Sequence, residues 1–426
     1  MSNQAKVVTR VLDEELAKFE ADNICLRQTE IKRMGGQTGH RSEFTEWYDV
    51  PYVSTTVDGL TLPNFNEITG LAVPHRVNVY TNVKFKLTNT DTLDGSELAR
   101  KVRSGFQALD NRINRAVANA VAIQGSQYVS STTALSGFQN VADVETRFCE
   151  QDVSQMSEKT MILNASDYNG MAADLQVASR TIAPGSISET AYEKARIAEI
   201  ANFLTFKSSF TPTKSAAVLA STTVTGAQSY SPVGSVNDAE GNPTNVDNRT
   251  MNLVVGSTTG VVAGDKFTIA GVNAISMQNK NDTGELRTFT VTEVVDGTNM
   301  TISPPIVVPV ATPTTTAEQS EADWANCNAV AGAGATLTFI NYDDAKTNLF
   351  WENESVCINV APVVGSEEDL GGMILMNAQT ELGLNVVIAK QGAIGDLSTE
   401  WRMTTFFGVT VRDPLKCGVL AGLQTP

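Results

Sequence analysis

Histidine and cysteine are scarce in this sequence of 426 residues. There are two histidines, His40 and His75, which excludes most zinc sites and most Ser/His or Cys/His nucleophile systems. The five cysteines are isolated, odd in number and never spaced Cys-x-x-Cys, a pattern typical of reduced thiols rather than of a disulfide framework. No stretch reaches 18 apolar residues, and the N-terminus is charged where a signal peptide would be apolar. We therefore expect no membrane segment and synthesis in the cytoplasm.

Positive charge is also in short supply. Lys and Arg number 31 against 47 Asp and Glu, which gives a formal net charge of −16 and an isoelectric point near 4.7. Because phosphate binding needs a cationic surface, this balance disfavours a free-standing nucleic-acid-binding protein. With 42% hydrophobic and 18% charged residues, the chain has the composition of a folded protein, and its length allows two or three domains.

The common ligand-binding motifs are missing. The glycine-rich turn 256–260 is not followed by the lysine of a phosphate loop, and the pair Gly332–Gly334 lacks the third glycine of a dinucleotide fingerprint. Residues 279–284 resemble the start of a calcium loop, but Asn stands first and Thr290 replaces the bidentate Glu at position twelve. No pair of carboxylates lies in an apolar context that would favour general acid catalysis. The sequence predicts no metal, no cofactor and no catalytic residue, so the protein is not expected to be an enzyme.

What the N-terminus does contain is a short amphipathic helix that ends before a break at Met34-Gly35-Gly36. Asp13 and Glu14 lie off its apolar stripe. A helix this short must cover either its own domain or a partner, and the sequence leaves both interpretations open. The stripe repeats at helical spacing through Val8, Leu12, Leu16 and Phe19.

A long strand is predicted from Val77 to Thr88, where apolar and polar residues alternate with period two. At about 3.3 Å per residue it spans roughly 40 Å. Residues 44–53 are rich in aromatic and β-branched residues. The simplest interpretation is a two-stranded arm formed by these two segments, with a loop at its tip. Such an arm is marginal alone and needs a surface to lie on.

The strongest helical signal follows, with Asp94 and Glu97 as the expected cap and Gly125 as the expected end. At about 1.5 Å per residue this helix is about 42 Å long. It carries five basic residues against Glu97 and Asp110, and a solvated face explains them better than a ligand site. The stripe comprises Leu98, Val102, Phe106, Leu109, Ile113, Val117, Ala120 and Ile123.

The composition changes at about Thr211 and stays rich in Thr, Ser, Asn, Gly and Val until about Ile340. Short strands with turns between them predict a small all-β domain, a sandwich or a barrel, inserted into a discontinuous α+β domain. Helices are predicted before it at 141–150 and 188–204. The strands of the insertion are predicted at 251–255, 266–269, 287–295 and 300–303.

One polar segment of the insertion, residues 237–249, is broken by glycine and proline and is long enough to project as a surface loop. It is either a passive hairpin tip or an acidic finger that meets a basic patch on a neighbour. Its charged residues are Asp238, Glu240, Asp247 and Arg249.

Six blocks of the sequence carry a resemblance to a known family: residues 225–232, 241–249, 264–272, 294–298, 344–351 and 383–385. They resemble the major coat proteins of short-tailed bacteriophages, which build the Hong Kong 97 type capsid fold with an inserted β-barrel domain. The resemblance covers nearly the whole chain; it is most specific in the insertion and weakest in the arm. The loop 278–287 departs from the family in composition.

The resemblance implies an α+β fold of the Hong Kong 97 type with these parts: an N-terminal arm (1–34), an E-loop β arm (35–93), a spine helix of the peripheral domain (94–125), an axial or central α+β domain (126–220 and 343–399), an inserted β-barrel domain (221–342) and a C-terminal strand of the peripheral domain (400–426).

The resemblance also implies a major capsid protein of the virion, made in the host cytoplasm. It would self-assemble as hexamers and pentamers, with a scaffolding protein and a portal protein, into an icosahedral shell. That shell would expand on packaging and enclose double-stranded DNA without sequence-specific binding. Two alternatives remain: a β-rich tail or surface adhesion component, and an enzyme with an unrecognised carboxylate site.

Two sets of interaction residues follow from the resemblance. Asp13 and Glu14 fall where the family's Val-Asp-Glu type motif receives the scaffolding protein. The charged loop reaches between neighbouring capsomers and would form ion pairs there through Asp238, Glu240, Asp247 and Arg249.

Overall fold

The computed structural model describes residues 14–19, 22–34, 43–48, 70–88, 95–182, 197, 199–232, 236–237, 243–244, 247–311, 313–361, 374–393 and 398–426. The chain forms two compact units, each made of three segments. Unit 1 comprises 1–44, 75–117 and 356–410, and unit 2 comprises 45–74, 118–355 and 411–426.

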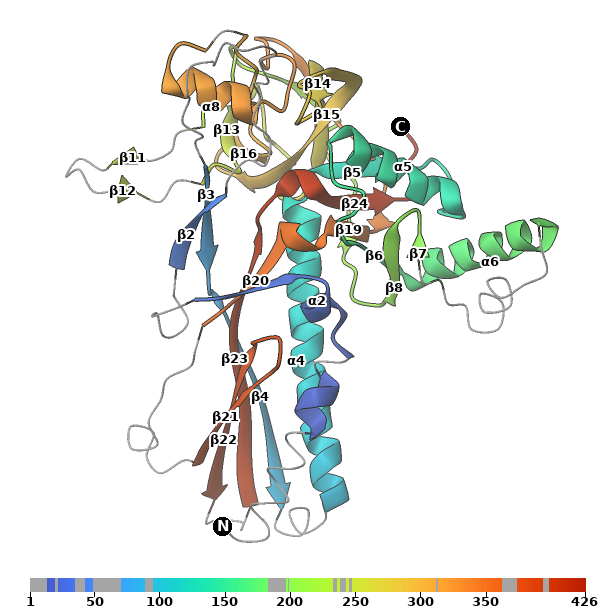
Figure 1. Ribbon diagram of the computed structural model, residues 1–426, viewed down its shortest axis with the longest axis vertical. Helices are drawn as coiled ribbons and strands as arrows, with labels where there is room; N and C mark the ends of the chain where they lie inside the picture. The colour runs from blue at the N-terminus through green and yellow to red at the C-terminus, as the bar shows by residue number, and fades with distance from the viewer. Residues whose placement is uncertain are drawn as a thin grey trace, which may run out of the picture. The chain divides into compact units, whose positions relative to one another are not determined.

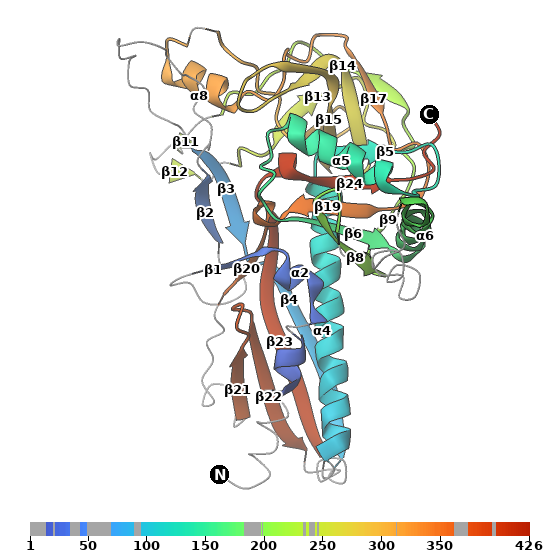
Figure 2. The ribbon, with the colours of Figure 1, turned by 45° about the vertical axis from the view of Figure 1, so that its right-hand side comes forward.

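Unit 1 is built from one long helix and one mixed sheet, which run alongside each other (Figures 1 and 2). The helix is α4 (Gly95–Gln124), whose residues after Val117 belong to unit 2. At Gly105 the helix has no side chain, and Met403 and Phe85 of the sheet lie against it. The strand order is β1 (Glu30–Arg33), β20 (Val356–Val360), β23 (Ser398–Val411), β22 (Asn385–Ala393) and β21 (Ile374–Gln379), with β4 (Val79–Thr88) paired to β23.

Strand β4 confirms the predicted alternation but not the predicted partner. Its odd-numbered residues are the more buried ones, and its even-numbered residues are exposed. It pairs antiparallel with β23 from Thr88↔Ser398 to Val79↔Phe407, whereas β2 (Glu43–Tyr48) pairs with β3 (Leu71–Arg76). The predicted pairing of 44–53 with 77–88 is therefore wrong for residues 44–48, and residues 49–53 lie outside the described part of the chain. Period-two patterning gives the face of a strand and not its neighbour, and here that neighbour lies far away in the sequence.

Helix α4 follows its predicted stripe for most of its length. The stripe is buried from Leu98 to Val117, but Ile123 is 37% exposed and Val121 is buried instead. The buried face rotates because the neighbours of the helix change along it. The helix ends where predicted, since the Gly125 N–H donates to the Val121 carbonyl at 2.9 Å and a Cβ at Gly125 would collide with that oxygen. The predicted cap residue Asp94 lies outside the described residues.

The non-inserted part of unit 2 is a six-stranded mixed sheet with two helices, α5 (Phe138–Glu150) and α6 (Ala165–Ile182). The rings of Phe148, Phe203 and Phe350 pack together in its core at 5.4 to 6.4 Å between centroids. The strand order is β5 (Gln127–Ser130), β24 (Cys417–Ala421), β19 (Asn348–Glu352), β6 (Lys159–Asn164), β8 (Phe203–Ser208) and β7 (Glu199–Ile200).

Two helix predictions in this part had different outcomes. The helix predicted at 141–150 is confirmed as α5. The helix predicted at 188–204 is wrong in its described part, where β7 and β8 begin, and α6 was not predicted. Strand β8 pairs parallel with β6, an interaction between separate segments that no local pattern encodes.

The insertion is a closed antiparallel barrel. Its first and last strands are joined by a bridge between Val224 and Val255, so the sheet has no free edge along that join. Phe267, Phe289 and Phe339 pack together inside it. The strand order is β10 (Ser221–Thr223), β17 (Thr336–Phe339), β14 (Lys266–Ile275), β15 (Asp282–Val294), β16 (Asn299–Ser303) and β13 (Met251–Val254). A β-barrel therefore forms within the predicted insertion, but the insertion is not purely β, because the nine-residue helix α8 (Thr316–Trp324) lies between β16 and β17.

Smaller elements complete the described chain. Helix α8 (Thr316–Trp324) begins with a capping box between Thr315 and Glu318. The others are α2 (Ile24–Arg27), the pair β9 (Thr213–Lys214) and β18 (Ala345–Lys346), the pair β11 (Val236–Asn237) and β12 (Pro243–Thr244), and the 3₁₀ turns η1 (Asn353–Ser355) and η2 (Pro414–Lys416).

Candidate assembly surfaces

The N-terminal helix lies on α4 through one ion pair and one aromatic contact. Residues 14–19 are helical, and Leu16 and Phe19 are buried as predicted. The Phe19 and Phe106 rings are 5.4 Å apart. The Glu15 carboxylate accepts hydrogen bonds from Arg103 at 2.9 and 3.1 Å. The helix therefore packs on its own subunit.

Two adjacent glutamates of this helix face different ways. Glu15 is buried, and hydrogen bonding from the Arg103 guanidinium holds the pKa of its carboxyl below the usual range, with Lys18 adding to the effect at 2.8 Å. Glu14 is exposed. The sequence analysis did not single out Glu15, because nothing in the helical pattern reveals an arginine 88 residues away. Asp13, like Val8 and Leu12, lies outside the described residues.

A groove beside this contact contains a carboxyl with a shifted pKa. Burial raises the pKa of Asp110 to about 6; the hydrogen bond from Asn114 opposes the shift, and the charge of Asp22 adds to it. The same Asn114 accepts from the Cys25 backbone N–H at 3.3 Å, which fixes α2 to α4. The groove is lined by Glu15, Lys18, Phe19, Asp22, Arg103, Phe106, Gln107 and Asp110.

The predicted inter-capsomer loop is described only in part. Strands β11 and β12 pair antiparallel, as a hairpin would, whereas Asp238 and Glu240 lie outside the described residues. Asp247 and Arg249 form an ion pair with each other at 2.7 Å, and Arg249 also donates to the Val411 carbonyl at 2.6 Å. These two charges are therefore partnered within the chain. Ion pairs across a capsomer boundary stay a prediction.

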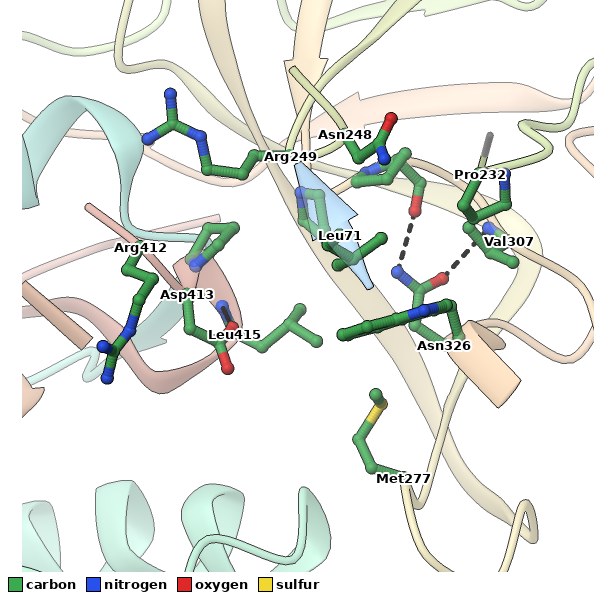
Figure 3. A pocket seen from close by; sticks show the side chains of 14 residues that line it. Leu71, Pro232, Asn248, Arg249, Met277, Val307, Asn326, Arg412, Asp413 and Leu415 are labelled. Carbon is green, nitrogen blue, oxygen red and sulfur yellow. Dashed lines mark hydrogen bonds between the residues drawn. The ribbon is translucent and has the colours of Figure 1, made fainter. Parts of the chain in front are cut away.

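An apolar pocket lies in unit 2 where three segments meet (Figure 3). Leu71 comes from β3, Met277 and Val307 come from the inserted domain, and Leu415 comes from η2. The Asn326 side chain accepts from the Val307 N–H at 3.1 Å and donates to the Pro305 carbonyl at 2.8 Å. The cavity holds about 50 Å³, room for a few water molecules or one side-chain end. It serves as a packing junction.

The barrel is joined to the helices of unit 2 by polar side chains. Lys266 of β14 donates to the Gly125 carbonyl, just beyond the end of α4, and to Thr290 Oγ1, which donates to the Ile123 carbonyl at 2.8 Å. Arg287 of β15 donates to the Gln151 side chain at the end of α5. Two buried basic side chains thus lie at the C-terminal ends of two helices, where a helix dipole favours positive charge.

Burial lowers the pKa of Lys266 to about 7, with the Lys214 charge adding to the shift and Asp265 and Cys417 opposing it. The sequence offered only a weak signal for this contact. Phe267 and Ile269 alternate toward the barrel interior, so Lys266 must point outward, but the sequence does not show what lies there.

Features of metal sites and membrane helices are absent from the described part of the chain. Within it, no group of three or more His, Cys, Asp or Glu residues could hold a metal ion, and no helix is long and apolar enough to cross a membrane. His75 is buried, with its Nδ1 2.9 Å from the Asn359 side chain.

Comparison with known proteins decides the family. Residues 1–422 match the family model described as P22 coat protein, gene protein 5. This chain belongs to the P22 coat protein family. Because the match spans nearly the whole coat protein, the predicted family is confirmed, and so is the predicted function of a major capsid protein that self-assembles into the virion shell.

The coat protein is also similar to solved structures. A capsid structure of cyanophage P-SCSP1u shares 11% identity, with 93% of this chain and 87% of that chain covered and a TM-score of 0.44. The mature capsid of bacteriophage PhiM1 shares 8% identity, with 95% and 88% covered and a TM-score of 0.43. The CUS-3 coat protein I-domain shares 33% identity over 29% of this chain and 96% of that chain, with a TM-score of 0.22.

Proposed function

We propose that this coat protein assembles with a scaffolding protein and a portal protein into an icosahedral shell of hexamers and pentamers. The shell is built in the host cytoplasm, expands on packaging and encloses double-stranded DNA without sequence-specific binding. The observation that supports scaffold-directed assembly is the way the N-terminal helix is held on α4. Glu15 faces Arg103 at 2.9 Å, while Glu14 is exposed beside it.

This arrangement suits a partner that must bind during assembly and leave afterwards. Phe19 and Glu15 fix the helix to its own subunit, so the helix does not need the partner in order to be placed. Exposed carboxylates attract a basic segment, and such pairs are weakened by salt. Glu14 and the neighbouring Asp13 are the acids we assign to scaffold binding.

The test is co-sedimentation of scaffolding protein with preformed shells over a salt series. Asp13→Ala combined with Glu14→Gln should reduce the bound scaffold at low salt and leave the subunit folded. Glu293→Gln is the matched control, since it removes one exposed carboxylate from unit 2. Binding that is indifferent both to salt and to the double variant would reject scaffold recognition by this helix.

The charged loop at 237–249 is proposed to join neighbouring capsomers. Exposed ion pairs are each worth about 0 to 1 kcal/mol, but a closed shell repeats them in every copy. Asp247→Ala should leave the monomer folded and make shells fragile, as seen by negative-stain microscopy after dilution.

A second loop variant separates contacts between copies from the pair inside the chain. Asp247→Ala also releases Arg249 from its partner within the chain. Asp238→Asn with Glu240→Gln leaves that internal pair in place. Intact, stable shells from this double variant would show that Asp238 and Glu240 do not bind a neighbour.

We further propose that the chain is structural and is not an enzyme. The features that support this are the two histidines of the sequence and the buried position of His75. A broad turnover screen on purified shells tests it, and a reproducible activity that co-purifies with them would contradict it.

A further inference from the structure

The charges of the chain are divided unequally between its two units. Unit 1 holds 17 basic and 17 acidic residues, whereas unit 2 holds 14 basic and 30 acidic residues. The whole net charge of −16 therefore belongs to unit 2. Within unit 1, helix α4 is locally positive, with five basic residues against Glu97 and Asp110.

One side of α4, here called the outer face, carries Arg100, Arg112 and Arg115, three of the five basic residues of the helix. Arg100 pairs with Glu97 at 2.9 Å. Arg112 and Arg115 are exposed, and neither has an ion pair or a hydrogen bond to a described residue. Asp110 bonds to Asn114 and lies on another side of the helix, since ideal helical geometry separates it from Arg112 by about 160°.

The remaining exposed positions of the outer face are small or neutral. Ser104, Ala108, Asn111 and Asn119 lie between and beyond the arginines, and no large apolar side chain is exposed from Arg100 to Asn119. From Arg100 to Arg115 the face extends about 22 Å, at about 1.5 Å per residue. Along this length the arginines are not screened by bulky neighbouring side chains of the helix itself.

We propose that the outer face of α4 binds the phosphate backbone of double-stranded DNA through Arg112 and Arg115. This rests on the proposed function, in which the shell encloses that DNA. Guanidinium groups match phosphate geometry, and backbone contacts carry no sequence information. Protein partners bury apolar and aromatic anchors, which this face does not offer, whereas nucleic-acid interfaces are polar and cationic.

The contact is weak because of the charges around it. Two arginines in a chain of net charge −16 give a low affinity for each copy, which many copies in one shell multiply. DNA held in this way stays mobile along its length, because no base is read.

The experiment titrates full-length, unassembled coat protein with a labelled duplex of about two helical turns and arbitrary sequence at several salt concentrations. Arg112→Gln with Arg115→Gln should weaken binding and flatten the slope of log K against log salt by about 1.8, because each neutralised phosphate contributes about 0.9 to that slope. The matched control is Lys207→Gln with Lys346→Gln, which removes two exposed cations from unit 2. It should keep the wild-type slope.

Three outcomes would overturn the proposal. The first is a wild-type protein that does not bind the duplex even at the lowest salt. The second is an equal weakening of binding in both double variants, which would reflect net charge alone. The third is an arginine variant that binds DNA normally but fails to form shells with scaffold, which would make the outer face a contact between copies. Failure of wild-type protein to form shells would instead reject the proposed function.

Discussion

The sheet of unit 1 and the barrel of unit 2 differ in how far apart in the sequence their paired strands lie. The barrel is one stretch of chain, 221–339, that closes on itself through the Val224–Val255 bridge. The sheet of unit 1 pairs strands from both ends of the chain, such as β4 with β23 and β1 with β20. A local sheet is readable in its sequence and has its own core, whereas a sheet of distant strands depends on the rest of the fold.

The largest loss of stability is expected from a substitution in the barrel core. Phe267 is fully buried, with the Phe289 and Phe339 rings 5.5 and 5.8 Å away. Phe267→Ala should cost about 3 to 5 kcal/mol of unfolding free energy, the usual range for a core phenylalanine. Chemical denaturation measures this. Val218→Ala, at a side chain 79% exposed, is the control and should change little. A small effect at Phe267 would mean that the barrel core repacks freely.

The corresponding change in unit 1 is Gly408→Ala in β23. A Cβ there would overlap the carbonyl oxygen of Arg76, so either the backbone or the strand pairing must shift. We expect a destabilisation of about 1 to 3 kcal/mol, as for other overpacked sites. Gly297→Ala is the matched control, since a Cβ at that turn meets no atom within 4 Å. Equal stability of the two variants by thermal melting would contradict the close approach.

The junction between barrel and helices can be probed by pH. The folded pKa of Lys266, about 7, lies below its ordinary value of 10.5, so the unfolded chain binds more protons between these values. Wild-type stability should therefore rise with pH across this window. Lys266→Met lacks this titrating amine. When the pH falls from ~9 to ~6, its unfolding free energy should therefore increase by about 1 to 2 kcal/mol relative to that of wild type.

The readout is the difference in unfolding free energy between variant and wild type at the two pH values. Lys346→Met is the control, since Lys346 is an exposed lysine of unit 2 whose charge does not contribute to the pKa shift of Lys266. A constant difference for Lys266→Met would show that this amine does not titrate in the folded state.

The smallest effect is expected beside α4 in unit 1. Asp110 has a folded pKa of about 6, above its ordinary 3.8, so the folded state binds more protons between these values. Stability therefore falls as the pH rises from the unfolded pKa through the folded one. Asp110→Asn should stabilise the protein by about 1 kcal/mol at pH ~7, after allowance for solvent screening, and by much less at pH ~4. A gain that is equal at both pH values would assign the effect to packing instead.

The assembly residues were predictable to different degrees. Asp13 and Glu14 came from the family resemblance, and the structure adds that Glu14 is exposed while Glu15 is held by Arg103. Asp247 and Arg249 were predicted as charges of a projecting loop, but their mutual ion pair was not. Charge and loop character are local properties of the sequence. Partners are not, because they depend on which segments the fold brings together.

The sequence by itself determined the elements whose signal is local. The stripe from Leu98 to Val117 and the glycine at 125 defined α4, and dense turns between short strands marked the strands of the insertion, although not its helix α8. Tertiary structure alone decided the partner of β4, the parallel pairing of β6 with β8, and the burial of Lys266 against the end of α4. The reason is physical: periodicity records which side of an element is buried, whereas the identity of what buries it is a property of the whole chain.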